Sequence, residues 1–206
     1  MTLNISKQSG YLARYYDGLC RQFSRSYKTV GWYSYKTQEA RFNIASQIAD
    51  WNGQSILDIG CGLGDLWGYL KENGIAAHYS GIDISQKMIA LSQAHFPEVS
   101  FRVQDLFDRH FQEKYDYCFA SGPFNHRLNV SQNIYIQEAI SRMVEISTKG
   151  VVFNVLSDKT PFKKRQDHEF FYYNAQELAV FSQTLVSRVV VKENYLPNDV
   201  TLFLYK

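Results

Sequence analysis

The chain has 206 residues, which predicts a single domain because globular domains typically hold roughly 100 to 200 residues. Hydrophobic residues make up 45% and charged residues 20%, so the composition excludes an intrinsically disordered chain. The 22 basic and 20 acidic residues leave a net charge of +2, which argues against a non-specific nucleic-acid binder.

The cysteines argue against a metal-binding or redox protein, and the apolar runs argue against a membrane protein. Cys20, Cys61 and Cys118 are odd in number and widely spaced, so they form neither a zinc motif nor a redox pair, and we expect no metal. A reduced, cytoplasmic environment is the default for such a chain. The apolar runs fall short of the roughly 18 residues that a membrane span needs, and residues 1–10 lack the apolar core of a secretory signal, so we expect no membrane partner.

The spacing of apolar residues predicts helix in the first quarter of the chain. Residues 11–51 are expected to be helical, with Phe42, Ala45 and Ile48 at helical spacing, and Gly53 follows this stretch. Helices and strands then alternate. Apolar or β-branched segments predict strands over 55–59, 79–84, 99–103, 115–120, 150–156, 186–192 and 200–205. Helical spacing and caps predict helices over 66–73, after Ser85, through 136–144 and from Asn174 to Gln183.

This alternation predicts a doubly wound α/β fold with helices on both faces of a mostly parallel sheet of seven strands. The last two strands break the pattern, because only residues 193–199, which include Pro197, separate them. So short a connection suits an antiparallel return. We therefore expect one antiparallel strand near the C-terminal edge of the sheet.

A glycine-rich loop, Asp58-Ile-Gly60-Cys-Gly62-Leu-Gly64, follows the first predicted strand and opens a helix. Glycines in this context let the backbone approach a ligand closely. The dinucleotide fingerprint would need a further glycine at position 65, where this chain has Asp65. The loop therefore predicts a ligand site that is not a dinucleotide site.

Carboxylates mark the ends of three successive predicted strands: Asp58 lies near the end of the first, Asp83 lies at the end of the second, and Asp105 follows the third. Asp65 opens the helix after the loop. Because the carboxyl ends of parallel strands share one edge of a sheet, we expect these side chains to converge. Such a crevice repels a pyrophosphate but accepts a cationic ligand. Asp83 is spaced from the loop like an acidic residue that bonds ribose hydroxyls, and Asp105 is placed to accept a hydrogen bond from an adenine amino group.

A ligand with adenine, ribose, an ammonium and a sulfonium meets these demands, and S-adenosylmethionine is such a ligand. Residues 54–206 resemble the class I, Rossmann-like S-adenosylmethionine-dependent methyltransferases. The family's Asp/Glu-x-Gly-x-Gly-x-Gly loop matches residues 58–64, and its acidic residues after the second and third strands match Asp83 and Asp105. The resemblance implies an enzyme that transfers a methyl group, releases S-adenosylhomocysteine and needs no metal. The cofactor contacts implied in this way are Asp58, Gly60, Cys61, Gly62, Gly64, Asp83, Ile84, Met88, Asp105, Leu106 and Ser121.

The segment from Trp32 to Phe42 resembles small stand-alone bacterial members of this group, in which the helix before the first strand covers the cofactor. On this basis residues 1–50 are expected to form a helical lid, and residues 51–206 the methyltransferase domain. Arg41 is a candidate to bind the cofactor's carboxylate, with Gln38 on the same helix face. The alternative is a surface arginine on an amphipathic helix.

The methyl acceptor is expected beside the segment after the fourth strand, where Phe124 and Asn125 are candidate substrate contacts. Methyltransferases that act on base amines carry a related motif there, but Gly122 replaces its first proline. His126 and His168 are candidate general bases. The alternative for His126 is a loop histidine that lies on the surface or bonds to backbone. Tyr172 belongs to an aromatic run that either walls the acceptor pocket or packs under the next helix.

A small molecule is the predicted acceptor, because no module for binding RNA or DNA is recognisable. The alternatives are methylation of RNA or protein, and a non-catalytic binding module that keeps the fold. The resemblance also leaves open aminopropyl transfer from a decarboxylated cofactor, for which Arg41 would be superfluous.

Overall fold

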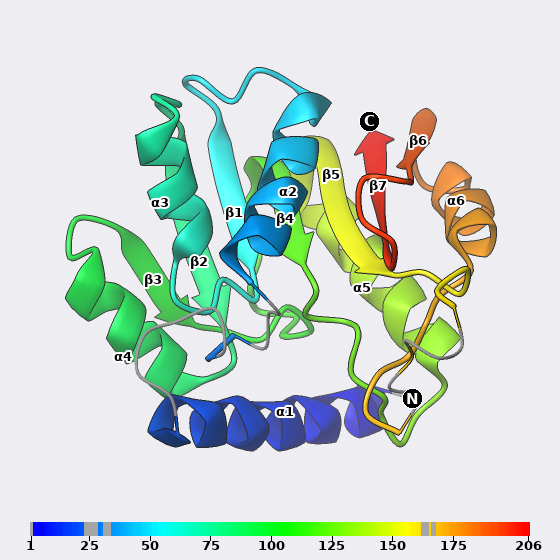
Figure 1. Ribbon diagram of the computed structural model, residues 1–206, viewed down its shortest axis with the longest axis horizontal. Helices are drawn as coiled ribbons and strands as arrows, with labels where there is room; N and C mark the ends of the chain where they lie inside the picture. Colours follow the sequence, from blue (N-terminus) through cyan, green and yellow to red (C-terminus); the bar gives the residue numbers. More distant parts are fainter. Residues whose placement is uncertain (1, 23–28, 31–33, 162–164, 166–167) are drawn as a thin grey trace.

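The computed structural model describes residues 2–22, 29–30, 34–161, 165 and 168–206 (Figure 1). Its centre is a seven-stranded sheet in the order β3-β2-β1-β4-β5-β7-β6. The strands are β1 (Ser55–Ile59), β2 (His78–Asp83), β3 (Ser100–Val103), β4 (Tyr115–Ser121), β5 (Ser147–Leu156), β6 (Arg188–Lys192) and β7 (Asp199–Tyr205). The predicted strands are therefore all present, with ends that differ by at most three residues.

The pairing of the strands confirms the predicted fold class. Strands β3, β2, β1, β4 and β5 run parallel, and β7 is antiparallel to both β5 and β6. The antiparallel strand thus lies one position in from the edge, and the short connection through Pro197 makes the predicted return. Because β1, β2, β3 and β4 are parallel, their carboxyl ends meet at one edge of the sheet.

Helices cover both faces of the sheet (Figure 1). They are α2 (Tyr35–Ala45), α3 (Asp65–Glu72), α4 (Gln86–His95), α5 (Gln132–Ile146) and α6 (Ala175–Gln183). Apolar residues of α2, α3 and α4 pack on one face, and those of α5 and α6 pack on the other. The predicted caps are confirmed: Ser85 accepts a hydrogen bond from the Met88 N–H of α4, and Asn174 accepts two from the first turn of α6.

The single helical stretch predicted over 11–51 is wrong in its bounds. The structure has two helices, α1 (Thr2–Gln22) and α2, and α2 is followed by a 3-10 turn over Ser46–Ile48. A new helix begins at Tyr35 because the Ser34 side chain accepts a hydrogen bond from the Thr37 N–H. Trp32 lies outside the described residues. No helix in the described ranges is long and apolar enough to span a bilayer.

Helix α1 does not pack on a face of the sheet. It crosses the edge at which the parallel strands end (Figure 1). Its contacts with α4 and with the segment after β5 hold it there: Ser85 Oγ donates to Asp17 Oδ1 at 2.6 Å, and Tyr15 Oη donates to Glu169 Oε1 at 2.6 Å. Helix α1 therefore covers the region to which the candidate site residues were assigned.

Candidate functional site

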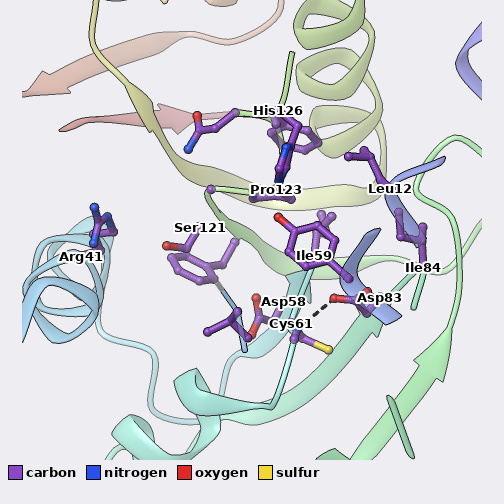
Figure 2. Close-up of a pocket in the computed structure, with 18 of the residues that line it drawn as sticks. Leu12, Arg41, Asp58, Ile59, Cys61, Asp83, Ile84, Ser121, Pro123 and His126 are labelled. Atoms are coloured by element: carbon purple, nitrogen blue, oxygen red, sulfur yellow. Dashed lines mark hydrogen bonds between the residues drawn. The ribbon is translucent and has the colours of Figure 1, made fainter. Parts of the chain in front are cut away.

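A cavity of about 900 Å³ lies at the carboxyl edge of the sheet, and α1 forms part of its wall (Figure 2). It brings together nearly all the predicted site residues: Gln38, Arg41, Asp58, Gly60, Cys61, Gly62, Asp83, Ile84, Met88, Asp105, Leu106, Ser121, Phe124, Asn125, His126 and Tyr172. Two predicted residues, Gly64 and His168, are not among those that line it.

The glycine loop forms one wall with bare backbone. Gly60 and Gly62 have φ angles of 69° and 53°, which glycine adopts at little cost. The N–H groups of Gly60 and Cys61 both donate to the Ile82 carbonyl, at 2.8 and 3.0 Å. A Cβ at Gly60 would lie 2.7 Å from Pro123 Cβ, so this position has no room for a side chain. Gly64 is the N-cap residue just before α3 and faces Phe101, which explains why it does not reach the cavity.

Two carboxylates, Asp58 and Asp83, are buried at the centre of this wall. Asp58 Oδ2 accepts a hydrogen bond from Tyr79 Oη at 2.7 Å. Asp83 accepts from the Gly62 N–H at 3.0 Å and the Ser85 N–H at 2.8 Å. Burial raises the pKa of Asp58 to about 7 and that of Asp83 to about 6, against the opposing effect of these uncharged donors. A cationic ligand would relieve the cost of burying both charges.

The other two predicted carboxylates reach the same cavity. Asp65 Oδ2 accepts from Gln38 Nε2 at 2.9 Å, and Asp105 Oδ1 accepts from the Phe107 N–H at 2.9 Å. The four aspartates predicted to converge therefore do so. No pyrophosphate fits comfortably among them, because its charge has the same sign as theirs.

Arg41 borders the cavity but is only 5% exposed, so it is not the surface arginine considered above. Its Nε and Nη2 donate to the two carboxylate oxygens of Asp199, at 2.8 and 2.6 Å. Its Nη1 donates to the Thr37 carbonyl at 2.7 Å. Asp199 therefore neutralises the charge that was predicted to meet a cofactor carboxylate. The sequence pattern missed this partner, which lies 158 positions away in the chain.

His126 lies inside the cavity, across from Asp58 and Cys61 (Figure 2). Its side chain is 5% exposed, and its ring centroid lies 4.6 Å from Tyr15, 5.5 Å from Tyr16 and 5.0 Å from Phe170. Burial lowers the pKa of His126, and the nearby charge of Glu169 acts in the opposite direction. His126 is therefore not a surface histidine, whereas His168 is exposed and outside the cavity.

The other candidate acceptor contacts, Phe124, Asn125 and Tyr172, also line the cavity. Phe124 is 3% exposed, and Asn125 Oδ1 accepts a hydrogen bond from the Leu156 N–H at 3.0 Å. Tyr172 is partly exposed, with the Arg165 guanidinium 5.3 Å from its ring centroid. The lining residues that were not named as candidates from the sequence come from α1, from α5 and from loops. They include Leu12, Tyr15, Tyr16, Phe107, Tyr135 and Phe170.

Comparison with known proteins identifies the family. Residues 56–146 match the model of a methyltransferase domain family. A Mycobacterium tuberculosis protein that carries a methyltransferase name, Rv1506c, is 30% identical over 152 residues, which cover 72% of this chain and 88% of that protein. The chain belongs to the class I S-adenosylmethionine-dependent methyltransferases. The predicted family is thereby confirmed.

Solved methyltransferase structures share the fold at low sequence identity. The magnesium protoporphyrin IX methyltransferase of Synechocystis PCC 6803, with bound S-adenosylhomocysteine, superposes with a TM-score of 0.68 at 16% identity, over 98% of this chain and 99% of that chain. The DhpI complex with S-adenosylhomocysteine has a TM-score of 0.65 at 19% identity, over 97% and 95% of the two chains. Both confirm the methyltransferase architecture.

The cavity of this methyltransferase fits S-adenosylmethionine by its own chemistry. When bound, the cofactor supplies a methyl group activated by a positively charged sulfonium. The buried carboxylates of Asp58 and Asp83 suit that charge and the ribose hydroxyls. Ser121 Oγ is buried with no hydrogen-bond partner among the described residues and lines the cavity, so it offers a donor and acceptor to a ligand.

The lining of the cavity divides into two parts. The cofactor half consists of Asp58, Gly60, Cys61, Gly62, Asp65, Asp83 and Asp105. The acceptor half consists of Leu12, Tyr15, Tyr16, Phe124, Asn125, His126, Phe170 and Tyr172.

Proposed function

We propose that this methyltransferase acts on a small molecule that binds in the acceptor half of the cavity. The observation that carries the proposal is the position of α1 across the carboxyl edge of the sheet, fastened by Tyr15 to Glu169 and by Asp17 to Ser85. An acceptor under this helix must fit within the cavity of about 900 Å³ that it shares with the cofactor. That volume is at the upper end of ligand sites and suits two ligands of modest size.

The chemistry of the acceptor half favours a flat, uncharged body. Its walls are mainly aromatic, and none of its residues carries a formal charge while His126 is neutral. Aromatic faces such as those of Tyr16 and Phe170 stack well on a planar ligand. A charged acceptor would lose its hydration here without gaining a partner charge.

We assign the cofactor contacts to the cofactor half and its neighbours. Asp83 accepts hydrogen bonds from the ribose hydroxyls, and Asp105 accepts from the adenine amino group. Gly60 and Gly62 let the backbone approach the ligand closely. Gln38 helps to hold the loop through Asp65 rather than meeting the cofactor's carboxylate directly.

The protein's main catalytic task is to hold the attacking atom in line with the methyl carbon, because the sulfonium already activates that carbon. Where the acceptor loses a proton, His126 is the residue that takes it. Its lowered pKa keeps the imidazole neutral and ready to accept a proton at neutral pH. Phe124 and Asn125 shape the pocket beside it.

Binding and turnover tests separate this proposal from its rivals. S-adenosylhomocysteine binding is measured by calorimetry for the wild type and for Asp83→Ala, and we expect at least a roughly tenfold weaker affinity in the variant. Turnover is then followed as methyl transfer to a panel of phenols and aromatic amines. Tyr11→Phe, on the exposed side of α1, is the control.

Each outcome points to one function. Methylated small molecules support the proposal, whereas cofactor binding with modified RNA or protein alone would overturn it. Lys7, Arg14 and Arg21 are exposed on α1, so a gel shift that weakens steeply with salt would favour nucleic acid. Tighter binding of the decarboxylated cofactor than of S-adenosylmethionine would favour aminopropyl transfer.

A further inference from the structure

Helix α5 carries two buried polar side chains, Gln132 and Arg142, that do not line the cavity. Gln132 is 7% exposed and Arg142 is 1% exposed. Long polar side chains are seldom buried unless they satisfy hydrogen bonds that nothing else supplies. Most of their partners are backbone groups of the two loops that carry cavity residues.

Arg142 binds the segment between β3 and β4. Its Nε donates to the Leu106 carbonyl at 3.2 Å, and its Nη2 donates to the carbonyls of Asp108 and Phe111. Glu145 lies one turn further along α5, with its carboxylate 2.7 Å from Arg142 Nη1.

The bound segment, residues 104–114, has neither helix nor strand. It nevertheless supplies Asp105, Leu106 and Phe107 to the cavity wall. A planar guanidinium with several donors in fixed directions can hold three carbonyls at once, which a lysine ammonium on a flexible stem does less well. Arg142 is therefore placed to fix the backbone from which the Asp105 carboxylate projects.

Gln132 binds the segment after β4 in the same manner. Its Oε1 accepts from the Leu128 N–H at 2.8 Å, and its Nε2 donates to the His126 carbonyl at 3.2 Å. Its Nε2 also lies 3.1 Å from Tyr173 Oη, which donates to the Phe124 carbonyl at 2.7 Å. Gln132 and Tyr173 together hold the backbone on both sides of Asn125.

We propose that Arg142 and Gln132 are positioning residues, of which Arg142 fixes the loop that receives the cofactor's adenosine and Gln132 fixes the loop that receives the acceptor. Helix α5 thus holds two loops, the segment between β3 and β4 and the segment after β4, through two separate side chains. A loop that is already held in place does not lose further conformational freedom when its ligand binds. Arg142 therefore raises the affinity for the cofactor, and Gln132 raises the rate of methyl transfer to the acceptor. The Arg142 part rests on the cofactor alone, and the Gln132 part also rests on the proposed acceptor site.

The test compares Arg142→Lys and Gln132→Leu with Ser141→Ala, a control on the same helix whose hydroxyl donates to the Gln137 carbonyl at 2.8 Å. The affinities for S-adenosylhomocysteine and for adenosine are measured by calorimetry. We expect Arg142→Lys to weaken the binding of both ligands by about tenfold, because a lysine cannot hold the three loop carbonyls at once. A tenfold loss corresponds to about 1.4 kcal/mol. Gln132→Leu and Ser141→Ala should bind both ligands like the wild type.

A second readout follows the acceptor loop without turnover. With isotope-labelled histidine, the His126 ring resonance should shift in Gln132→Leu and stay unchanged in Arg142→Lys. With any acceptor that the panel identifies, Gln132→Leu should lower kcat/KM while the KM for S-adenosylmethionine is unchanged. Because the resonance needs no acceptor, this result stands even if the enzyme methylates no small molecule.

Two results would overturn the proposal. One is a folded Arg142→Lys with unchanged adenosine affinity, and the other is an equal loss of cofactor affinity in both variants. If Arg142→Lys does not fold, Glu145→Gln keeps the arginine but removes its ion pair. That variant should weaken adenosine binding in the same direction by a smaller factor, and unchanged binding would count against Arg142.

Discussion

The two halves of the cavity are built in different ways. The cofactor half comes from the ends of β1, β2 and β3, and its residues lie within a short stretch of chain. The acceptor half is assembled from α1, the segment after β4 and the connection after β5. Its contacts join residues as far apart as Tyr15 and Glu169, 154 positions along the chain.

The position of the cofactor half follows from the sheet itself, whereas the acceptor half depends on contacts between distant segments. Parallel strands fix the cofactor half once the sheet forms, because their carboxyl ends share one edge. The acceptor half depends on hydrogen bonds between loops, such as those from the Phe171 N–H to the Asn125 carbonyl at 2.7 Å and from the Arg127 N–H to the Glu169 carbonyl at 2.9 Å. We therefore expect changes in the two halves to be separable in ligand affinity and in stability.

The largest expected effect is on stability, at the buried pair between Arg41 and Asp199. Arg41→Met leaves the Asp199 carboxylate buried and uncompensated, which costs about 3 to 5 kcal/mol in the free energy of unfolding. In the double variant Arg41→Met/Asp199→Asn, most of that loss should be recovered. Urea unfolding measures the free energy of unfolding of the single and the double variant.

The same double variant tests whether Arg41 contributes to the cofactor half of the cavity or only to the fold. If it binds S-adenosylhomocysteine like the wild type, Arg41 serves the fold. If affinity remains low although stability is restored, the guanidinium contributes directly to the cofactor site.

The next largest effect is expected at the glycine loop. In Gly60→Val the new Cβ would lie 2.7 Å from Pro123 Cβ, so the loop must shift. We expect this shift to weaken S-adenosylhomocysteine binding by about 100-fold, or about 2.8 kcal/mol. Gly53→Val is the matched control, because Gly53 has the same φ of 69° and no atom of the described residues lies within 4 Å of an added Cβ there. Equal affinities in the two variants, measured by calorimetry, would contradict the role of the bare backbone.

Sequence patterns predicted the cofactor half better than the acceptor half, and the particular residues explain why. Asp58 and Asp83 lie at the carboxyl ends of β1 and β2, and Asp105 follows β3, so topology alone brings them to the cavity. Tyr15 and Asp199 carry no local signal, because their partners lie in distant segments. The two histidine candidates looked alike in sequence, and only packing separates the buried His126 from the exposed His168.

A smaller effect is expected from pH, with opposite signs for stability and binding. The pKa values of Asp58 and Asp83, about 7 and about 6, lie above the ordinary value of 3.8 in the unfolded chain. The folded protein therefore takes up protons as pH falls from about 8 to about 5, and without ligand these groups make it more stable by up to about 1.4 kcal/mol per pH unit each. Affinity for the cationic cofactor should fall over the same range, because the carboxylates lose their charge.

The comparison with Asp58→Asn isolates this contribution. His126 acts in the opposite direction, since its lowered pKa makes the folded state less stable in acid, but it contributes equally to both proteins. Urea unfolding at about pH 8, 7 and 6 should give a weaker rise in stability for the variant. An identical pH dependence in the two proteins would show that Asp58 does not titrate in this range.

The smallest expected effect is at the fastening of α1, and it tests whether the two halves are separable. Tyr15→Phe removes the hydrogen bond to Glu169 Oε1, which is partly buried, and should lower the free energy of unfolding by about 1 to 2 kcal/mol. Because Tyr15 belongs to the acceptor half and not to the cofactor half, the S-adenosylhomocysteine affinity of the variant should match that of the wild type. Its kcat/KM for an acceptor should fall. Tyr11→Phe, whose ring is half exposed on the same helix, should change neither quantity. A loss of cofactor affinity in Tyr15→Phe as large as that in Gly60→Val would mean that α1 couples the two halves, and the strand ends would then not suffice to form the cofactor half.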